Sequence, residues 1–129
     1  MSLDVAPELL EQAANGEVDE TAFVATVRRS LPYAYALVDR VSAAAKAGDA
    51  PFADNQVPPS EAERGQLLRA LASDAIRGSL ERHFGVRLAF QNCHRVAAFP
   101  PAAMDGAAYR DFVSPRSQVL NQTPALRHC

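Results

Sequence analysis

The chain has 129 residues, of which 48% are hydrophobic and 22% charged. This composition indicates one folded domain and is not that of a disordered chain. The formal net charge of −2 provides no basic surface, so we expect no binding to nucleic acid. No stretch contains the roughly 20 successive apolar residues of a membrane helix, and the first residues do not resemble a secretory signal. We therefore expect a cytoplasmic protein without a membrane partner, in which the two cysteines are thiols.

Twelve of the 13 basic residues are arginine and alanine is abundant, a usage that favours a bacterial source with a GC-rich genome. In the first half of the chain, apolar residues recur at helical spacing. They predict helices over residues 4–14, 19–30 and 30–47. Asp19 is suited to capping the second helix, and Gly48 to ending the third. Residues 49–59 are rich in Pro, Asp and Asn and predict a loop.

The strongest helix signal comes next. Ser60 and Glu63 have the spacing of a capping box, the following residues keep one face apolar, and Gly85 is a typical end. We predict one long helix over 60–84, about 37 Å in length, as the central packing element.

The pattern then changes from helical to alternating. Val86, Leu88 and Phe90 alternate with other residues, as do Val96 and Ala98, and a period of two is typical of strands. We predict a short β-hairpin or extended pair at 86–99, followed by a short helix at 105–113 and an extended or short-helical tail at 114–129. The predicted fold class is a single, mainly α domain of about six helices.

The tip of this hairpin contains the main candidates for chemistry. Cys93 and His94 are neighbours, and with His83 they supply ligand types for a transition metal such as zinc. Their spacing does not match the usual zinc motifs. A second interpretation is redox sensing, because His94 and Arg95 would lower the pKa of a nearby thiol. The third is a buried cysteine beside a turn histidine, since free cysteine is often buried.

No sequence motif of a catalytic site, phosphate-binding loop or calcium loop is present. This favours a non-enzymatic protein over an enzyme. We expect a small accessory protein without a cofactor that binds a protein partner or forms a homodimer. Tyr and Arg are enriched where interfaces bind most strongly; the candidate binding residues are Asn92, Arg95, Tyr109 and Arg110. The alternatives are the metal- or thiol-based protein, and a small cofactor-independent enzyme with a site near Asn92, His94 and Arg95.

Overall fold

The computed structural model describes residues 2–48, 50–55, 57–92 and 94–122. Along these residues the elements are α1 (Pro7–Ala14), α2 (Glu20–Ser30), α3 (Pro32–Ala47), β1 (Ala53–Asn55), α4 (Glu61–Leu71), α5 (Asp74–Phe84), β2 (Arg87–Gln91), β3 (Arg95–Phe99), the 3₁₀ turn η1 (Pro101–Ala103), α6 (Ala107–Phe112) and α7 (Pro115–Leu120). The predicted fold class is confirmed: the described chain is mainly helical, with a short hairpin after α5.

The three strands form one antiparallel sheet in the order β1–β3–β2. In the hairpin, Arg87 pairs with Phe99 at one end and Gln91 with Arg95 at the other. Strand β1 lies inside the segment 49–59 that was predicted to be a loop, and it pairs with residues 96–98 of β3. It was missed because three residues are too few to show a period of two. Since β1 occupies the far side of β3, β2 is an edge strand.

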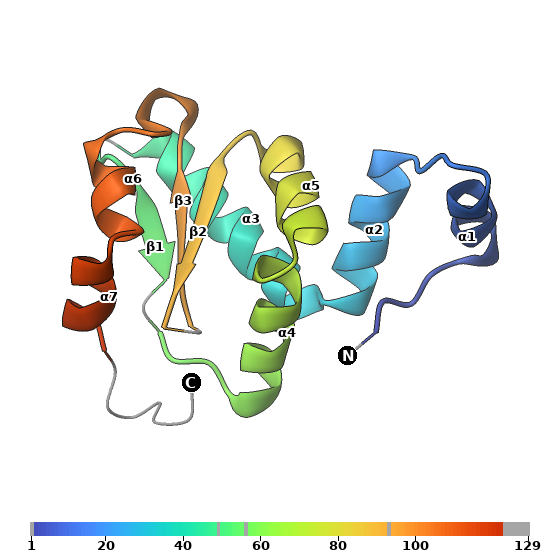
Figure 1. Cartoon of the computed structure of the whole chain (residues 1–129), viewed down its shortest axis with the longest axis horizontal. Coiled ribbons are helices and arrows are strands. Elements are labelled where there is room, and N and C mark those ends of the chain that lie inside the picture. The colour runs from blue at the N-terminus through green and yellow to red at the C-terminus, as the bar shows by residue number, and fades with distance from the viewer. Residues whose placement is uncertain (1, 49, 56, 93, 123–129) are drawn as a thin grey trace.

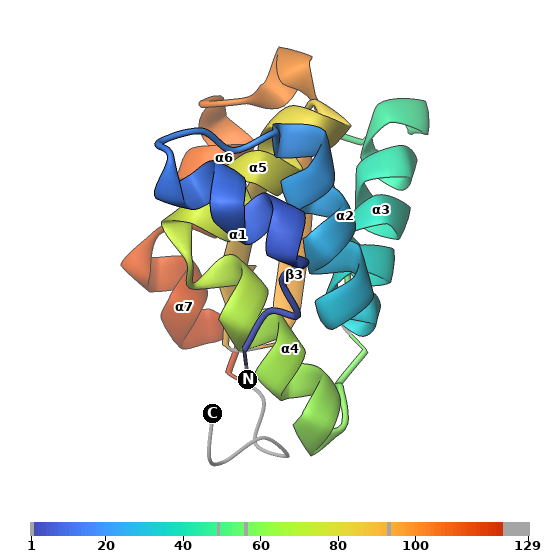
Figure 2. The same ribbon diagram turned by 90° about the vertical axis from the view of Figure 1, so that its right-hand side faces the viewer.

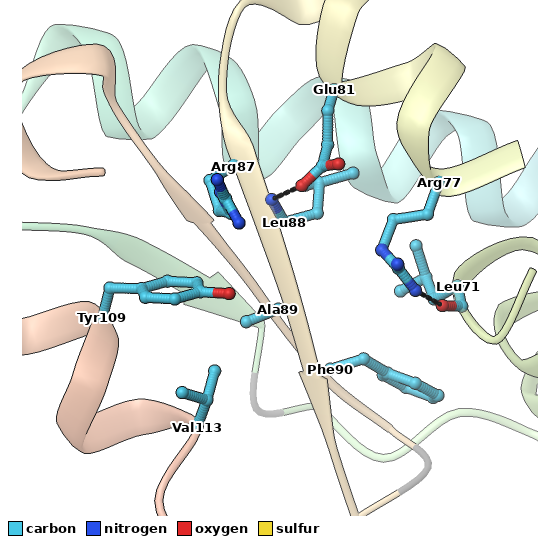
Figure 3. A pocket seen from close by; sticks show the side chains of 9 residues that line it. All are labelled: Leu71, Arg77, Glu81, Arg87, Leu88, Ala89, Phe90, Tyr109 and Val113. Atoms are coloured by element: carbon cyan, nitrogen blue, oxygen red, sulfur yellow. Dashed lines mark hydrogen bonds between the residues drawn. The ribbon is translucent and has the colours of Figure 1, made fainter. Parts of the chain in front are cut away.

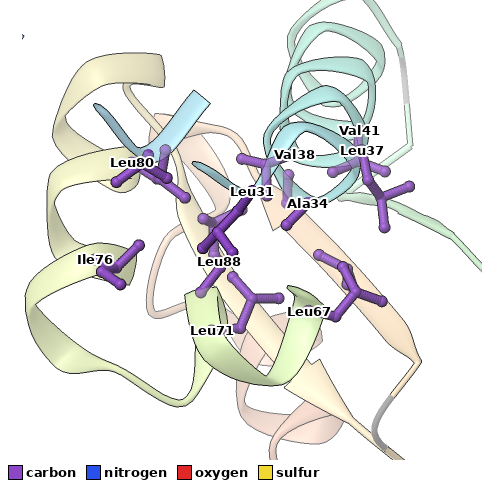
Figure 4. Close-up of a cluster of buried hydrophobic side chains, with 14 of the residues drawn as sticks. Leu31, Ala34, Leu37, Val38, Val41, Leu67, Leu71, Ile76, Leu80 and Leu88 are labelled. Atoms are coloured by element: carbon purple, nitrogen blue, oxygen red, sulfur yellow. The ribbon is translucent and has the colours of Figure 1, made fainter. Parts of the chain in front are cut away.

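The sheet lies between two groups of helices (Figure 1). Helices α2 to α5 cover one face and α6 with α7 the other. Successive side chains of a strand point to opposite faces, so Leu88 and Val96 join the larger core while Ala89 and Phe99 join the smaller one. Figure 4 shows the larger core, in which the fully buried side chains include Leu31, Leu37, Leu67, Ile76 and Leu80.

The predicted single helix over 60–84 is wrong, because α4 and α5 are separate helices. The Ser73 side chain accepts a hydrogen bond from the Ile76 amide at 3.3 Å and caps α5. On the other side of the break, Arg77 Nη1 donates to the Leu71 carbonyl at 2.9 Å. A seryl cap and a guanidinium thus satisfy backbone groups that a continuous helix would pair internally.

Three other predicted helix signals are confirmed. Ser60 and Glu63 form the capping box of α4, and Asp19 caps α2 by accepting from the Ala22 amide at 2.9 Å. Gly85 ends α5 with φ 66°, a left-handed conformation that costs glycine little.

The start of the chain differs in detail from the prediction. Helix α1 begins at Pro7; Asp4 instead donates its amide to the Ser30 hydroxyl at 2.8 Å and pairs with Arg29. Ser30 is the last residue of α2 and does not cap α3. The Tyr33 and Ala34 amides at the start of α3 instead donate to Gln66 Oε1, at 2.8 Å and 3.2 Å. Figures 1 and 2 show α1 on the outer side of the helical layer, away from the sheet.

In its described part, residues 114–122, the predicted tail at 114–129 contains one short helix. Ser114 caps α7 by accepting from the Ser117 amide at 3.1 Å. Residues 123–129 lie outside the described part of the chain. Among the helices that are described, none combines the length and the apolar character needed to cross a membrane.

Candidate interaction site at the edge of the sheet

The tip of the hairpin is attached to α7. Asn92 has φ 55°, a left-handed conformation that asparagine tolerates in turns. Its side-chain amide donates to the Asn121 carbonyl, and its side-chain oxygen accepts from Gln118. His94 is 4% exposed and donates from Nδ1 to the Asn92 carbonyl at 2.6 Å. Both predicted site residues, Asn92 and His94, therefore make contacts that fix this turn.

The neighbouring polar residues attach the sheet to α6. Arg95 Nε donates to Asp54 Oδ2 at 2.6 Å, and the guanidinium lies 5.0 Å from the ring centre of Phe112. Gln91 is buried and donates from Nε2 to the Phe112 carbonyl at 2.8 Å and to the Ser117 hydroxyl at 3.2 Å. The predicted binding residue Arg95 is thus used inside the fold.

Two of the predicted metal ligands, His83 and His94, lie at opposite ends of β2. His83 is near the end of α5, where its Nε2 is 3.4 Å from the Tyr35 hydroxyl. His94 follows the far end of β2, and a strand of five residues spans roughly 17 Å. In the described part of the chain, no three His, Cys, Asp or Glu side chains are grouped to hold a metal. Cys93 lies outside the described residues, so the metal and thiol hypotheses stay predictions.

A cleft of about 300 Å³ runs along the outer edge of β2. Figure 3 shows β2 as its floor, with one wall from α4 and α5 and the other from α6 and the residue after it. The residues that line it are Leu71, Arg77, Glu81, Arg87, Leu88, Ala89, Phe90, Tyr109 and Val113. Two layers of helices thus flank one strand edge.

The backbone of β2 is open toward this cleft. The Leu88 amide donates to Glu81 Oε2 at 2.8 Å, so this amide points away from β3. Backbone groups of alternate residues point the same way along a strand, which directs the Phe90 amide and carbonyl and the Leu88 carbonyl into the cleft. No described residue makes a hydrogen bond to these three groups. They are available to a further strand.

Guanidinium groups stand on both walls. Arg77 pairs with Asp74 at 2.6 Å, and Arg87 with Asp105 at 3.6 Å. Arg87 also lies 5.3 Å from the ring centre of Tyr109, and a side-chain hydrogen bond with Tyr109, followed by the charge of Asp105, raises the pKa of Arg87. The Asp74 and Asp105 side chains are 93% and 70% exposed. Exposed pairs contribute little, so a ligand carboxylate can replace these aspartates.

Among the predicted binding residues, only Tyr109 lines the cleft. Arg110 donates to the Asp105 carbonyl at 2.7 Å and lies outside it. Arg77, Arg87 and the edge at Phe90 were not predicted from the sequence. The alternating pattern placed Arg87 and Phe90 on a strand. Whether that strand lies at the edge of the sheet depends on where β1 pairs, which the pattern does not show.

The whole chain, residues 1–129, matches a family described as "NucS shadow ORF", whose short name also carries the letters KH. No curated protein and no solved structure matches it. The match covers every element described above. The chain belongs to the NucS shadow ORF family.

Proposed function

We propose that the protein is a non-enzymatic accessory module that binds a protein partner through the edge of β2. The observation that carries the proposal is that the Leu88 carbonyl and the Phe90 amide and carbonyl have no partner among the described residues and lie between two helical walls. An unpaired edge is a template for an added strand, and addition of a strand is a recurring mode of peptide recognition. Because of the two walls, only an extended chain can reach this edge.

The sequence favours a protein over a nucleic acid at this edge. The letters KH in the family name also denote a module that binds nucleic acid through a Gly-x-x-Gly loop clamping the backbone. The chain has six glycines, and no two of them have that spacing. The missing Gly-x-x-Gly spacing and the net charge of −2 therefore favour a protein partner, because phosphate binding depends on basic side chains.

A second copy of the chain is a weaker candidate for the occupant. A symmetric contact places the same patch on both subunits, so Arg77 and Arg87 of each copy would enter a contact already rich in arginine. Like charges brought together oppose association. Light scattering on the purified protein tests this point. A stable dimer that is lost in a variant of the β2 edge would show that the edge binds a second copy and not a different protein.

The experiment uses a photo-crosslinking residue in place of Val113, which lines the cleft and is 52% exposed. The matched control has the same residue in place of Val119, which is 70% exposed and does not line the cleft. After irradiation in the source cells, we expect a discrete protein adduct from position 113 and none from position 119. Adducts that nuclease removes, or equal adducts from both positions, would contradict the proposal.

Two substitutions at Phe90 show whether the backbone edge makes the contact. Phe90→Pro removes the outward amide and leaves the ladder to β3 intact, because proline is tolerated where the amide faces away from the sheet. Phe90→Ala removes the same ring and keeps the amide. We expect the adduct to disappear in the proline variant and to remain in the alanine variant. Loss in both, or retention in both, would argue against strand addition.

A further inference from the structure

The chemistry of the partner segment follows from the two walls of the cleft. A strand laid along β2 directs successive side chains to opposite faces. One side chain then faces the wall formed by α4 and α5, and the next faces the α6 wall. Each pair of neighbouring residues in the partner therefore meets both walls at the same level along β2.

At the level of Leu88, both walls present a cation. Arg77 belongs to the first wall and Arg87 lies toward the second, against Tyr109 (Figure 3). The Glu81 carboxylate, which also lines this end, accepts the hydrogen bond from the Leu88 amide. The lining thus contains two guanidinium groups and one carboxylate, which is already in use. The aspartates that pair with the guanidinium groups, Asp74 and Asp105, are exposed and do not line the cleft. Guanidinium groups form their strongest hydrogen bonds with carboxylates, so two neighbouring acidic side chains complement this level.

At the next level, both walls are apolar. Phe90 lies toward the first wall beside Leu71, and Val113 belongs to the second (Figure 3). The step from Leu88 to Phe90 is about 6.6 Å, since a strand rises about 3.3 Å per residue. It equals two residues of an added strand. The pair next to the acidic residues therefore meets apolar side chains on both faces.

We infer that the cleft beside β2 binds an extended peptide segment in which two consecutive acidic residues adjoin two consecutive aliphatic residues. The segment forms hydrogen bonds with the Phe90 amide, the Phe90 carbonyl and the Leu88 carbonyl. Glu81 ends the site at the other side of Leu88 by occupying its amide. The inference rests on the proposed function and adds the chemistry of the bound segment.

The test uses the full chain and short synthetic peptides carrying a fluorescent dye, with affinity measured by fluorescence anisotropy. Two probes contain two glutamates beside valine and isoleucine, one in each order, because the walls do not fix the direction of the segment. Their matched controls replace the glutamates by lysines or by glutamines. We expect at least one glutamate probe to bind, the lysine peptides not to bind, and added salt to weaken binding because it screens exposed charges.

Variants of the protein locate the contact. Arg77→Gln and Arg87→Gln should each weaken binding of the glutamate probe by about 5-fold, the upper range for an exposed ion pair. The matched control is Arg116→Gln, because Arg116 is an exposed arginine of α7 that pairs with Asp111 and does not line the cleft. It should leave the affinity unchanged. Circular dichroism of each variant verifies that it folds.

The outcomes separate the inference from the proposed function. Equal binding of glutamate and lysine peptides, with both arginine variants unchanged and Phe90→Pro inactive, would overturn the acidic assignment and leave strand addition intact. Undiminished binding of the glutamate probe to Phe90→Pro would contradict strand addition itself. Failure of every peptide to bind would overturn the inference, while the adduct at position 113 would still report on the proposed function.

Discussion

Replacing Gln91 should detach α6 and α7 from the sheet. Gln91 is 4% exposed. Its Nε2 donates to the Phe112 carbonyl and the Ser117 hydroxyl, and its Oε1 accepts from Arg95 Nη1 at 3.2 Å. Gln91→Met keeps the volume of the side chain but removes all of these hydrogen bonds. An unsatisfied buried polar group costs about 1–3 kcal/mol, so we expect the free energy of unfolding to fall by about 2 kcal/mol.

Gln91→Ala should cost more, about 2–4 kcal/mol, because a cavity adds to the lost hydrogen bonds. Urea denaturation followed by circular dichroism measures both values. The matched control is Gln12→Met, on the exposed side of α1, which removes only an exposed hydrogen bond from the Asp19 amide at 3.3 Å and should change the stability by less than about 0.5 kcal/mol. A loss for Gln91→Met no larger than that of the control would refute the account of how α6 is held.

The same substitution should affect the cleft. Tyr109 and Val113 form its second wall, and the carbonyl of Phe112 between them is the acceptor for Gln91. In Gln91→Met, hydrogen exchange of amides in α6 should therefore accelerate more than exchange in α3, since local stability depends on local contacts. Uniform acceleration throughout the chain would instead indicate global destabilisation only.

Three further predictions concern stability. Arg95→Met removes the ion pair between Arg95 and the largely buried carboxylate of Asp54 and should cost about 2 kcal/mol in urea denaturation, with part of the loss recovered when Asp54→Leu is added; a double variant no more stable than Arg95→Met would contradict this. Ser73→Ala removes the cap of α5 and should cost about 1 kcal/mol, whereas an unchanged midpoint would show that the cap does not stabilise the break. Burial raises the pKa of Tyr33, so its contribution to stability is present below about pH 10 and is lost as the pH rises through the folded pKa; Tyr33→Phe should reduce the alkaline decline in melting temperature, and an identical decline would refute the cause.

Local signals in the sequence predicted the boundaries of several elements. The capping box at Ser60 and Glu63 requires only side chains three residues apart. Gly85 ends α5 because it adopts a left-handed conformation at little cost. The start of the hairpin followed from the alternation that begins at Val86. Such features depend on neighbouring residues and can be inferred before the fold is known.

The break between α4 and α5 was missed although its signal is present. Ser73 followed by Asp74 is a typical start of a helix, but the apolar face continues through Leu71 and Ile76 and gave the impression of one element. The helical pattern reports which side is buried and not whether the backbone is continuous. A capping residue inside a run of helical periodicity can therefore indicate a break between two helices, even where the apolar face continues.

The candidate site depended on contacts that the sequence does not show. Arg77 and Tyr109 lie on elements far apart in the chain, and they flank the same strand only after the sheet has formed. The assignment of Asn92 and Arg95 as binding residues considered their chemistry alone. In the fold they bond to α7 and to Asp54, so the charged and polar groups of the tip contribute to the scaffold of the cleft.

The most direct test of strand addition is the hydrogen exchange of the Phe90 amide, measured by NMR with and without the glutamate probe. In the free protein this amide should exchange rapidly, because it points into the cleft and has no described partner. The Ala89 amide should be protected in both states, since Ala89 pairs with Ala97 of β3 and its backbone groups point the opposite way. Protection of Phe90 on adding the probe, with Ala89 unchanged, is the predicted result. Rapid exchange of Phe90 in the saturated complex would contradict the central claim.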